Sequence, residues 1–259
     1  MQAKTELRGS LRYLAPVLCI LFGGVIGLAG YYARIPYETR GWLRLGLCAV
    51  FLAGLFIFKR GKPAWHTSLA FLAVTAGLLA DRLLGDFLLV WIPVSPDDAR
   101  GYTLSKISET LPIILIILLI VLLSGRNLKE MYLRRGRLGW SLLGGLAVGV
   151  VLFGYFLSQG GWQVFQDGNL KVLLPTIGWV AVFSIFNGFM EELWFRGLFL
   201  SRFEWLLGQR WAFWVTALVF GLLHAFGSFT GTLGSALLTF FTLLMGMAFG
   251  YIVQKTGSI

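Results

Sequence analysis

Charged residues are scarce in this sequence of 259 residues, where Asp, Glu, Lys and Arg together account for 13%. A soluble domain carries about 25%. Apolar residues make up 57% instead, the mean hydropathy is +0.78, and apolar runs of about 20 residues recur throughout the chain. The scarcity of charge excludes a soluble globular domain and predicts an all-α polytopic membrane protein with about eight transmembrane helices.

Cysteine and histidine are scarce as well. Cys19 and Cys48 lie within apolar runs, where we expect small buried side chains and no disulfide. His66 follows a basic segment and is expected at the membrane interface, and the other histidine is His224. Zinc normally takes three or more protein ligands that include His or Cys, and the chain has no HExxH motif. We therefore expect no cofactor.

Acidic residues are outnumbered by basic ones, 12 against 22, which leaves a net charge of +10. The basic residues lie in short clusters between apolar runs, so anionic lipid headgroups explain them better than nucleic acid does. Most of them lie on the alternate loops that include both ends of the chain. By the positive-inside rule, the chain is predicted to be a multi-pass protein of the cell membrane with both termini in the cytoplasm.

Eight apolar segments are long enough to be membrane spans. They cover approximately residues 13–33, 42–58, 64–80, 104–123, 138–158, 174–195, 211–227 and 232–253. Asp86 and Pro93 interrupt the apolar segment 83–95, which we expect to extend the third helix or to lie at the interface. Gly246 and Gly250 form a GxxxG motif, which favours close packing of the last span.

The basic segment 126–137 divides the chain into two regions. Residues 1–125 form an N-terminal membrane region with four of the expected spans. Residues 126–259 form a C-terminal membrane region that holds the unusual polar residues.

Two carboxylates and a guanidinium lie in one of the most apolar runs of the C-terminal region. A charged side chain inside a bilayer costs from about 3 to more than 10 kcal/mol, so it is retained where it is paired or used. Glu192 and Arg196 are four residues apart and can form an ion pair on one helix face. Glu191 points about 100° away from Glu192 and shares a face with Asn187. We therefore expect Glu191 to do the chemistry.

His224 is predicted to lie level with Glu191. The two residues lie at nearly equal distances in sequence from a turn at Gly208, so an antiparallel helical hairpin brings them to one depth at ~1.5 Å per residue. Phe220 lies one turn before His224 and would separate its imidazole from lipid. A carboxylate beside an imidazole suits water activation, with Glu191 as the general base and His224 as a donor to the oxyanion or to the leaving amine.

At these residues the sequence resembles the CAAX-processing and bacteriocin-processing (CPBP) family of intramembrane glutamate proteases. These proteases are related to the eukaryotic CAAX prenyl endopeptidase. The EExxxR motif of the family reads here as Glu191, Glu192 and Arg196, and its FxxxH motif reads as Phe220 and His224.

The resemblance covers roughly residues 130–259. It implies hydrolysis of a peptide bond in a membrane-associated peptide or lipidated protein. By analogy, the first glutamate of the motif activates water, the second glutamate and the arginine support it, and the histidine assists. Members of the family continue into a last helix with a second histidine and often an asparagine. The sequence ends at Ile259 without them, so we expect a fragment or a member of reduced activity.

Four other interpretations remain open at this point. The ion pair and His224 can be purely structural, with the histidine bonded to a carbonyl in the core. The chain can be a catalytically weak or inactive membrane protein, such as a bacteriocin-immunity or scaffold factor. Zinc can be bound by Glu191, Glu192 and His224. A proton-coupled transporter also uses intramembrane carboxylates and histidines, but we find no inverted repeat and expect only one cluster of buried ionisable groups.

Overall fold

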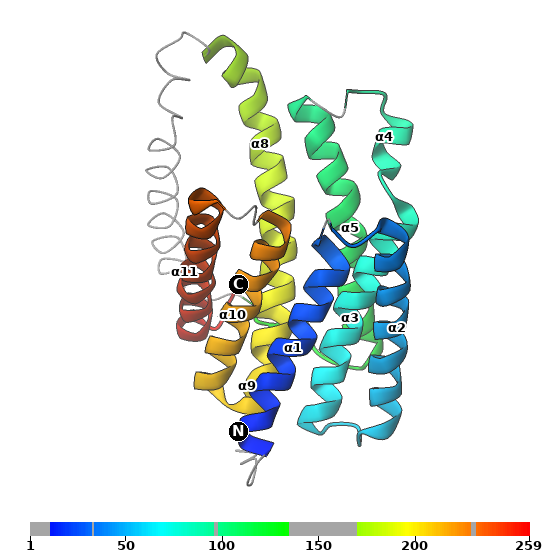
Figure 1. The fold of residues 1–259 in the computed structure, drawn as a ribbon, viewed down its shortest axis with the longest axis vertical. Helices are drawn as coiled ribbons and strands as arrows, with labels where there is room; N and C mark the ends of the chain where they lie inside the picture. Colours follow the sequence, from blue (N-terminus) through cyan, green and yellow to red (C-terminus); the bar gives the residue numbers. More distant parts are fainter. Residues whose placement is uncertain (1–10, 33, 96–97, 135–169, 229–231) are drawn as a thin grey trace.

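A computed structural model describes residues 11–32, 34–95, 98–134, 170–228 and 232–259 of the chain. Every regular element in these ranges is helical, which confirms the predicted all-α membrane fold (Figure 1). The elements are α1 (Leu11–Tyr31), α2 (Tyr37–Ile57), α3 (Pro63–Leu84), α4 (Phe87–Trp91), α5 (Ala99–Leu123), the 3₁₀ turn η1 (Leu128–Met131), α8 (Leu170–Glu191), the π-helical segment η3 (Glu192–Leu200), α9 (Ser201–Leu207), α10 (Gln209–Ser228) and α11 (Leu233–Thr256).

Six stretches in the described ranges are long and apolar enough to cross a membrane. They are Tyr13–Tyr31, Tyr37–Ile57, Pro63–Trp91, Ala99–Leu123, Gln209–Gly227 and Leu233–Thr256. The predicted number of eight is not confirmed, because the expected span 138–158 lies outside the described residues. Helix α8 covers most of the expected span 174–195 but is not among the six. The segment 83–95 continues α3 only after a break at Gly85, beyond which the short helix α4 follows.

Helices α1, α2, α3 and α5 pack together, and α8 to α11 pack beside them (Figure 1). The two groups meet where α1 contacts α10 and where α5 contacts α8. Glycines bring α1 very close to α10: a Cβ atom on Gly23 would lie 2.7 Å from Val219, and one on Gly27 would lie 2.7 Å from Leu223. Gly23 and Gly27 are a GxxxG pair that the sequence analysis overlooked.

The predicted close packing at Gly246 and Gly250 is present. A Cβ atom on Gly246 would lie 3.1 Å from the ring of Phe220, and one on Gly250 would lie 3.4 Å from the ring of Phe213. Helix α11 therefore lies directly against α10 on the side that carries Phe220.

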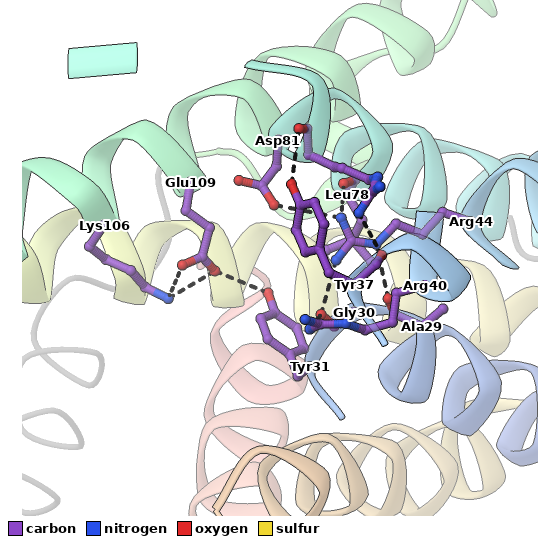
Figure 2. A network of polar contacts seen from close by, with 11 residues as sticks. Ala29, Gly30, Tyr31, Tyr37, Arg40, Arg44, Leu78, Asp81, Lys106 and Glu109 are labelled. Atoms are coloured by element: carbon purple, nitrogen blue, oxygen red, sulfur yellow. Dashed lines mark hydrogen bonds and ion pairs between the residues drawn. The ribbon is translucent and has the colours of Figure 1, made fainter. Parts of the chain in front are cut away.

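Arg44 of α2 fixes the last turn of α1. It donates from Nε to the carbonyl oxygen of Ala29 (2.9 Å), from Nη2 to that of Gly30 (3.0 Å) and from Nη1 to that of Leu78 in α3 (2.5 Å; Figure 2). Its side chain also lies 3.8 Å from the carboxylate of Asp81. The last carbonyls of a helix lack partners within the helix, so this buried guanidinium both caps α1 and joins it to α3.

A second polar cluster joins η1, α9 and α11. Tyr132 and Gln254 both donate hydrogen bonds to the carboxylate of Glu204, and the fully buried Arg202 forms an ion pair with Glu130 at 3.0 Å. Burial raises the pKa of the Glu204 carboxyl, and the two hydrogen bonds oppose that rise. The cluster fixes the end of the helical bundle at which the hairpin of α9 and α10 turns.

Candidate active site

Glu191 is the last residue of α8, and the chain continues from it into a π-helical segment, Glu192–Leu200. A π-helix has more residues per turn than an α-helix and changes the direction of the side chains that follow. The residues between Glu191 and the turn at Gly208 therefore do not form a continuous α-helix, which the count at ~1.5 Å per residue assumed. Such segments are rare and occur frequently at functional sites.

The structure nevertheless brings Glu191 and His224 together. Oε1 of Glu191 lies 3.7 Å from Nε2 of His224, which confirms the predicted equal depth of the two residues. Asn187, one turn earlier on α8, donates from Nδ2 to the same carboxylate oxygen at 2.9 Å. Both side chains of the pair are partly exposed, at 24% for Glu191 and 31% for His224. The pair is therefore accessible from a cavity.

The other ring nitrogen of His224 is held by the backbone. Nδ1 lies 2.9 Å from the carbonyl oxygen of Phe220, and since a carbonyl only accepts, Nδ1 carries a proton. Nε2 therefore faces Glu191 as an acceptor in the neutral ring and as a donor in the imidazolium form. The histidine is bonded to a carbonyl, as the structural interpretation expected, and is also placed for proton transfer.

Glu192 and Arg196 form the predicted ion pair, with 2.8 Å between Oε1 and Nη1. The guanidinium of Arg196 is buried between two rings, 4.7 Å from the centroid of Phe220 and 5.3 Å from that of Phe249. The ring of Phe220 also lies 4.4 Å from that of His224. Phe220 thus contacts both the guanidinium of the ion pair and the imidazole, whereas the sequence predicted only that it separates the imidazole from lipid.

A cavity of about 390 Å³ opens at Glu191 and His224. Its polar and aromatic lining includes Tyr31, Tyr102, Lys106, Asn187, Glu191 and His224. Glu192, Arg196 and Phe220 are not among the residues that line it. The structure therefore separates the predicted site into residues that line the cavity and residues that do not, of which Arg196 and Phe220 are buried and Glu192 is 27% exposed.

Two residues of the N-terminal region meet at a carboxylate beside this cavity. The hydroxyl of Tyr31 donates to Glu109 at 3.3 Å, and Nζ of Lys106 lies 2.9 Å from each oxygen of the same carboxylate (Figure 2). The ring of Tyr31 also stacks on that of Trp194, with the centroids 6.3 Å apart. Tyr31 and Lys106 were not among the residues predicted for the site. Lys106 and Glu109 had a usable signal, because both are charged residues inside the expected span 104–123.

One expectation about polar groups is wrong. Glu109 with Lys106, and Arg44 with Asp81, are further ion pairs within the spans, so the buried ionisable groups do not form a single cluster. His66, near the start of α3, is fully buried, and its position at the membrane interface stays a prediction. The Arg126 guanidinium lies 2.9 Å from its Nε2.

The candidate metal ligands are few. Across the ranges that the structure describes, no three His, Cys, Asp or Glu side chains gather into a group that could hold a metal. At the site, Glu191 and His224 are close enough to share an ion, while Glu192 is engaged by Arg196. The residues present therefore do not fit the three-ligand pattern of zinc.

Residues 173–259 match the family model described as type II CAAX prenyl endopeptidase Rce1-like. This segment is Rce1-like. No curated protein and no solved structure matches the chain. The resemblance to the CPBP membrane proteases is confirmed for this segment, which begins later than the expected residue 130.

The Rce1-like segment contains all six residues that the sequence analysis selected for the site, from Asn187 to His224. The N-terminal helices α1 and α5 lie outside the match, and they carry Tyr31, Tyr102 and Lys106. The cavity is therefore built from the Rce1-like segment on one side and from residues without a family match on the other.

Proposed function

We propose that this multi-pass membrane protein is an intramembrane endopeptidase that hydrolyses a peptide bond in a membrane-associated peptide or lipidated protein. The observation that carries the proposal is the 3.7 Å separation of Glu191 and His224 at a cavity of the Rce1-like segment. A carboxylate and an imidazole at one cavity can move protons to and from a single water molecule.

Glu191 acts as the general base. A water molecule bound between Glu191 and His224 gives one proton to the Glu191 carboxylate, and its oxygen adds to the carbonyl carbon of the substrate. His224 in its imidazolium form donates a hydrogen bond from Nε2 to the oxyanion. The tetrahedral intermediate then breaks its C–N bond, and the proton on Glu191 passes to the leaving amine. The products are a carboxylic acid and an amine, and Glu191 is again ionised.

The other predicted residues position these two. Asn187 holds the Glu191 carboxylate by its hydrogen bond at 2.9 Å. Arg196 neutralises Glu192 and packs on Phe220, whose carbonyl and ring both contact His224. We expect the bilayer to deliver the substrate, both termini to be cytoplasmic, and no metal to take part.

Glu191→Gln tests the proposal. The purified protein is placed in lipid nanodiscs with a fluorescent peptide in which S-farnesylcysteine precedes three apolar residues, and release of the tripeptide is followed by chromatography. Because glutamine cannot accept the water proton, we expect turnover to fall about 10²–10⁴-fold. Glu38→Gln is the matched control, since its carboxylate is 79% exposed and lies on α2.

Unchanged cleavage in Glu191→Gln would remove this mechanism. Absence of cleavage by the unaltered protein, against this peptide and against a library of other apolar peptides, would favour the scaffold or immunity interpretation instead.

A further inference from the structure

The cavity that contains the candidate catalytic pair is also lined by a cationic side chain. Lys106 of α5 lines the cavity, as do Glu191 and His224, and its side chain is 20% exposed. Lys106 lies inside a membrane span, where an ammonium is retained only if it is paired or used. It also lies outside the Rce1-like segment, so the family match assigns it no role.

Glu109 pairs with Lys106 but does not account for its position. Both carboxylate oxygens of Glu109 lie 2.9 Å from Nζ, and the hydroxyl of Tyr31 also donates to this carboxylate. Glu109 itself is not among the residues that line the cavity, whereas Lys106 is. An ammonium has three donors, so the pair leaves donor capacity on the side of Lys106 that faces the cavity.

The cavity is lined by charges of both signs. Among the residues that line the cavity, Glu191 repels an anionic group of a ligand and Lys106 attracts one. A cavity of about 390 Å³ is near the lower end of the usual range for small ligands, so it holds a short peptide segment and not a folded chain. A short peptide that reaches Lys106 with an anionic group does so most simply with its own C-terminus.

We propose that Lys106 binds the C-terminal carboxylate of the substrate and thereby places a peptide bond close to that terminus beside Glu191. This inference rests on the proposed function and adds a specificity determinant to it. Glu109 and Tyr31 are positioning residues, because they hold the lysine side chain and do not themselves contact the substrate carboxylate.

Binding to the Glu191→Gln protein in nanodiscs tests the inference without turnover. The probe is the fluorescent S-farnesylcysteine peptide with three further apolar residues, made once with a free C-terminal carboxylate and once as the carboxamide. Fluorescence anisotropy gives the two dissociation constants. Because a hydrogen bond to a charged group is lost with the amide, we expect the acid to bind about 10- to 100-fold more tightly.

Variants then show which residue causes the preference for the acid over the amide. In Lys106→Met, the acid is expected to bind as weakly as the amide, whose own affinity stays the same. Lys106→Arg restores the preference, because it restores the positive charge. Glu109→Gln keeps the ammonium and is expected to keep the preference. Lys129→Met, at an exposed position of η1, is the control and changes neither constant.

Three results would overturn the inference. They are equal binding of acid and amide by the parent protein, no binding of either peptide, and an equal loss for both peptides in Lys106→Met and Glu109→Gln. The last result would assign a merely structural role to the pair. Because the assay measures binding, a preference that depends on Lys106 in a protein that cleaves nothing would reject the proposed function and retain the carboxylate site.

Discussion

The Rce1-like segment and the N-terminal helices each hold a buried arginine, and they do so by different means. Arg196 is paired with Glu192, four residues away on the same helical segment, and lies between two aromatic rings. Arg44 is bonded to three backbone carbonyls that are 14, 15 and 34 residues distant in sequence. The first arrangement is local and appears as a motif, whereas the second forms only when three helices pack.

This difference explains why one region is recognisable and the other is not. Short-range constraints on residue type, such as those that join Glu191, Glu192 and Arg196, can be read from a sequence, and these residues lie in the segment that matches the family model. Backbone carbonyls accept hydrogen bonds whatever side chain they carry, so the arrangement around Arg44 leaves no comparable pattern. The two regions nonetheless line one cavity. Variants in each region can therefore test whether the Rce1-like segment determines turnover while the N-terminal helices determine stability.

His224→Gln should give the largest effect among the remaining variants. We propose that His224 donates to the oxyanion, and loss of one such donor lowers turnover about 10²–10³-fold. Because the change leaves the packing of α1 and α5 intact, the KM of the S-farnesyl peptide should change little. Steady-state kinetics in nanodiscs measure both constants. A rise in KM with unchanged kcat would place His224 in substrate binding and not in the chemical step.

Arg44→Met should affect stability more than chemistry. It removes the guanidinium donor from the carbonyls of Ala29, Gly30 and Leu78, of which Gly30 keeps Arg40 as a second donor. Because buried unsatisfied groups cost about 1–3 kcal/mol each, we expect a loss of about 3 kcal/mol. Thermal unfolding in detergent, followed by tryptophan fluorescence, measures the change. Arg34→Met, at an exposed position, is the control.

If Arg44→Met instead unfolded at the temperature of the control, the capping role of the guanidinium would be rejected. If Arg44→Met lowered kcat without lowering the unfolding temperature, the N-terminal helices would contribute to the reaction and not only to stability.

The sequence was sufficient for the fold class, and it predicted that the residues on one side of the candidate site lie close together. Hydropathy identifies spans because the bilayer demands long apolar helices, and the turn at Gly208 allowed the depths of Glu191 and His224 to be compared by counting residues. The π-helical segment lies between Glu191 and Gly208, within the counted stretch, and the two side chains nevertheless approach to 3.7 Å. Nothing in the sequence predicted that segment, because its residues are also compatible with an α-helix.

The other half of the site depends on contacts between helices. Tyr31 reaches the cavity because Gly23 and Gly27 let α1 lie against α10, and no spacing within α1 shows which helix it will contact. Lys106 was detectable as a charge in an apolar run, but its placement on the cavity follows from the packing of α5 against α8. Tertiary contacts of this kind have no signal in a single sequence.

Gly23→Ala should give a smaller effect and tests the contact between the two regions most directly. The added Cβ would lie 2.7 Å from a methyl group of Val219, whose branched side chain is stiff, so α1 must shift away from α10. Such overpacking typically costs about 1–3 kcal/mol. Gly24→Ala is a matched control on the next residue, because nothing lies within 4 Å of its added Cβ and alanine favours the helix. Thermal unfolding of the two variants in detergent measures the difference, and peptide cleavage shows whether the shift of α1 reaches the cavity.

Equal stability of Gly23→Ala and Gly24→Ala would mean that α1 is not closely packed on α10. In that case α1 could not supply the N-terminal wall of the cavity in the way that its contact with α10 indicates.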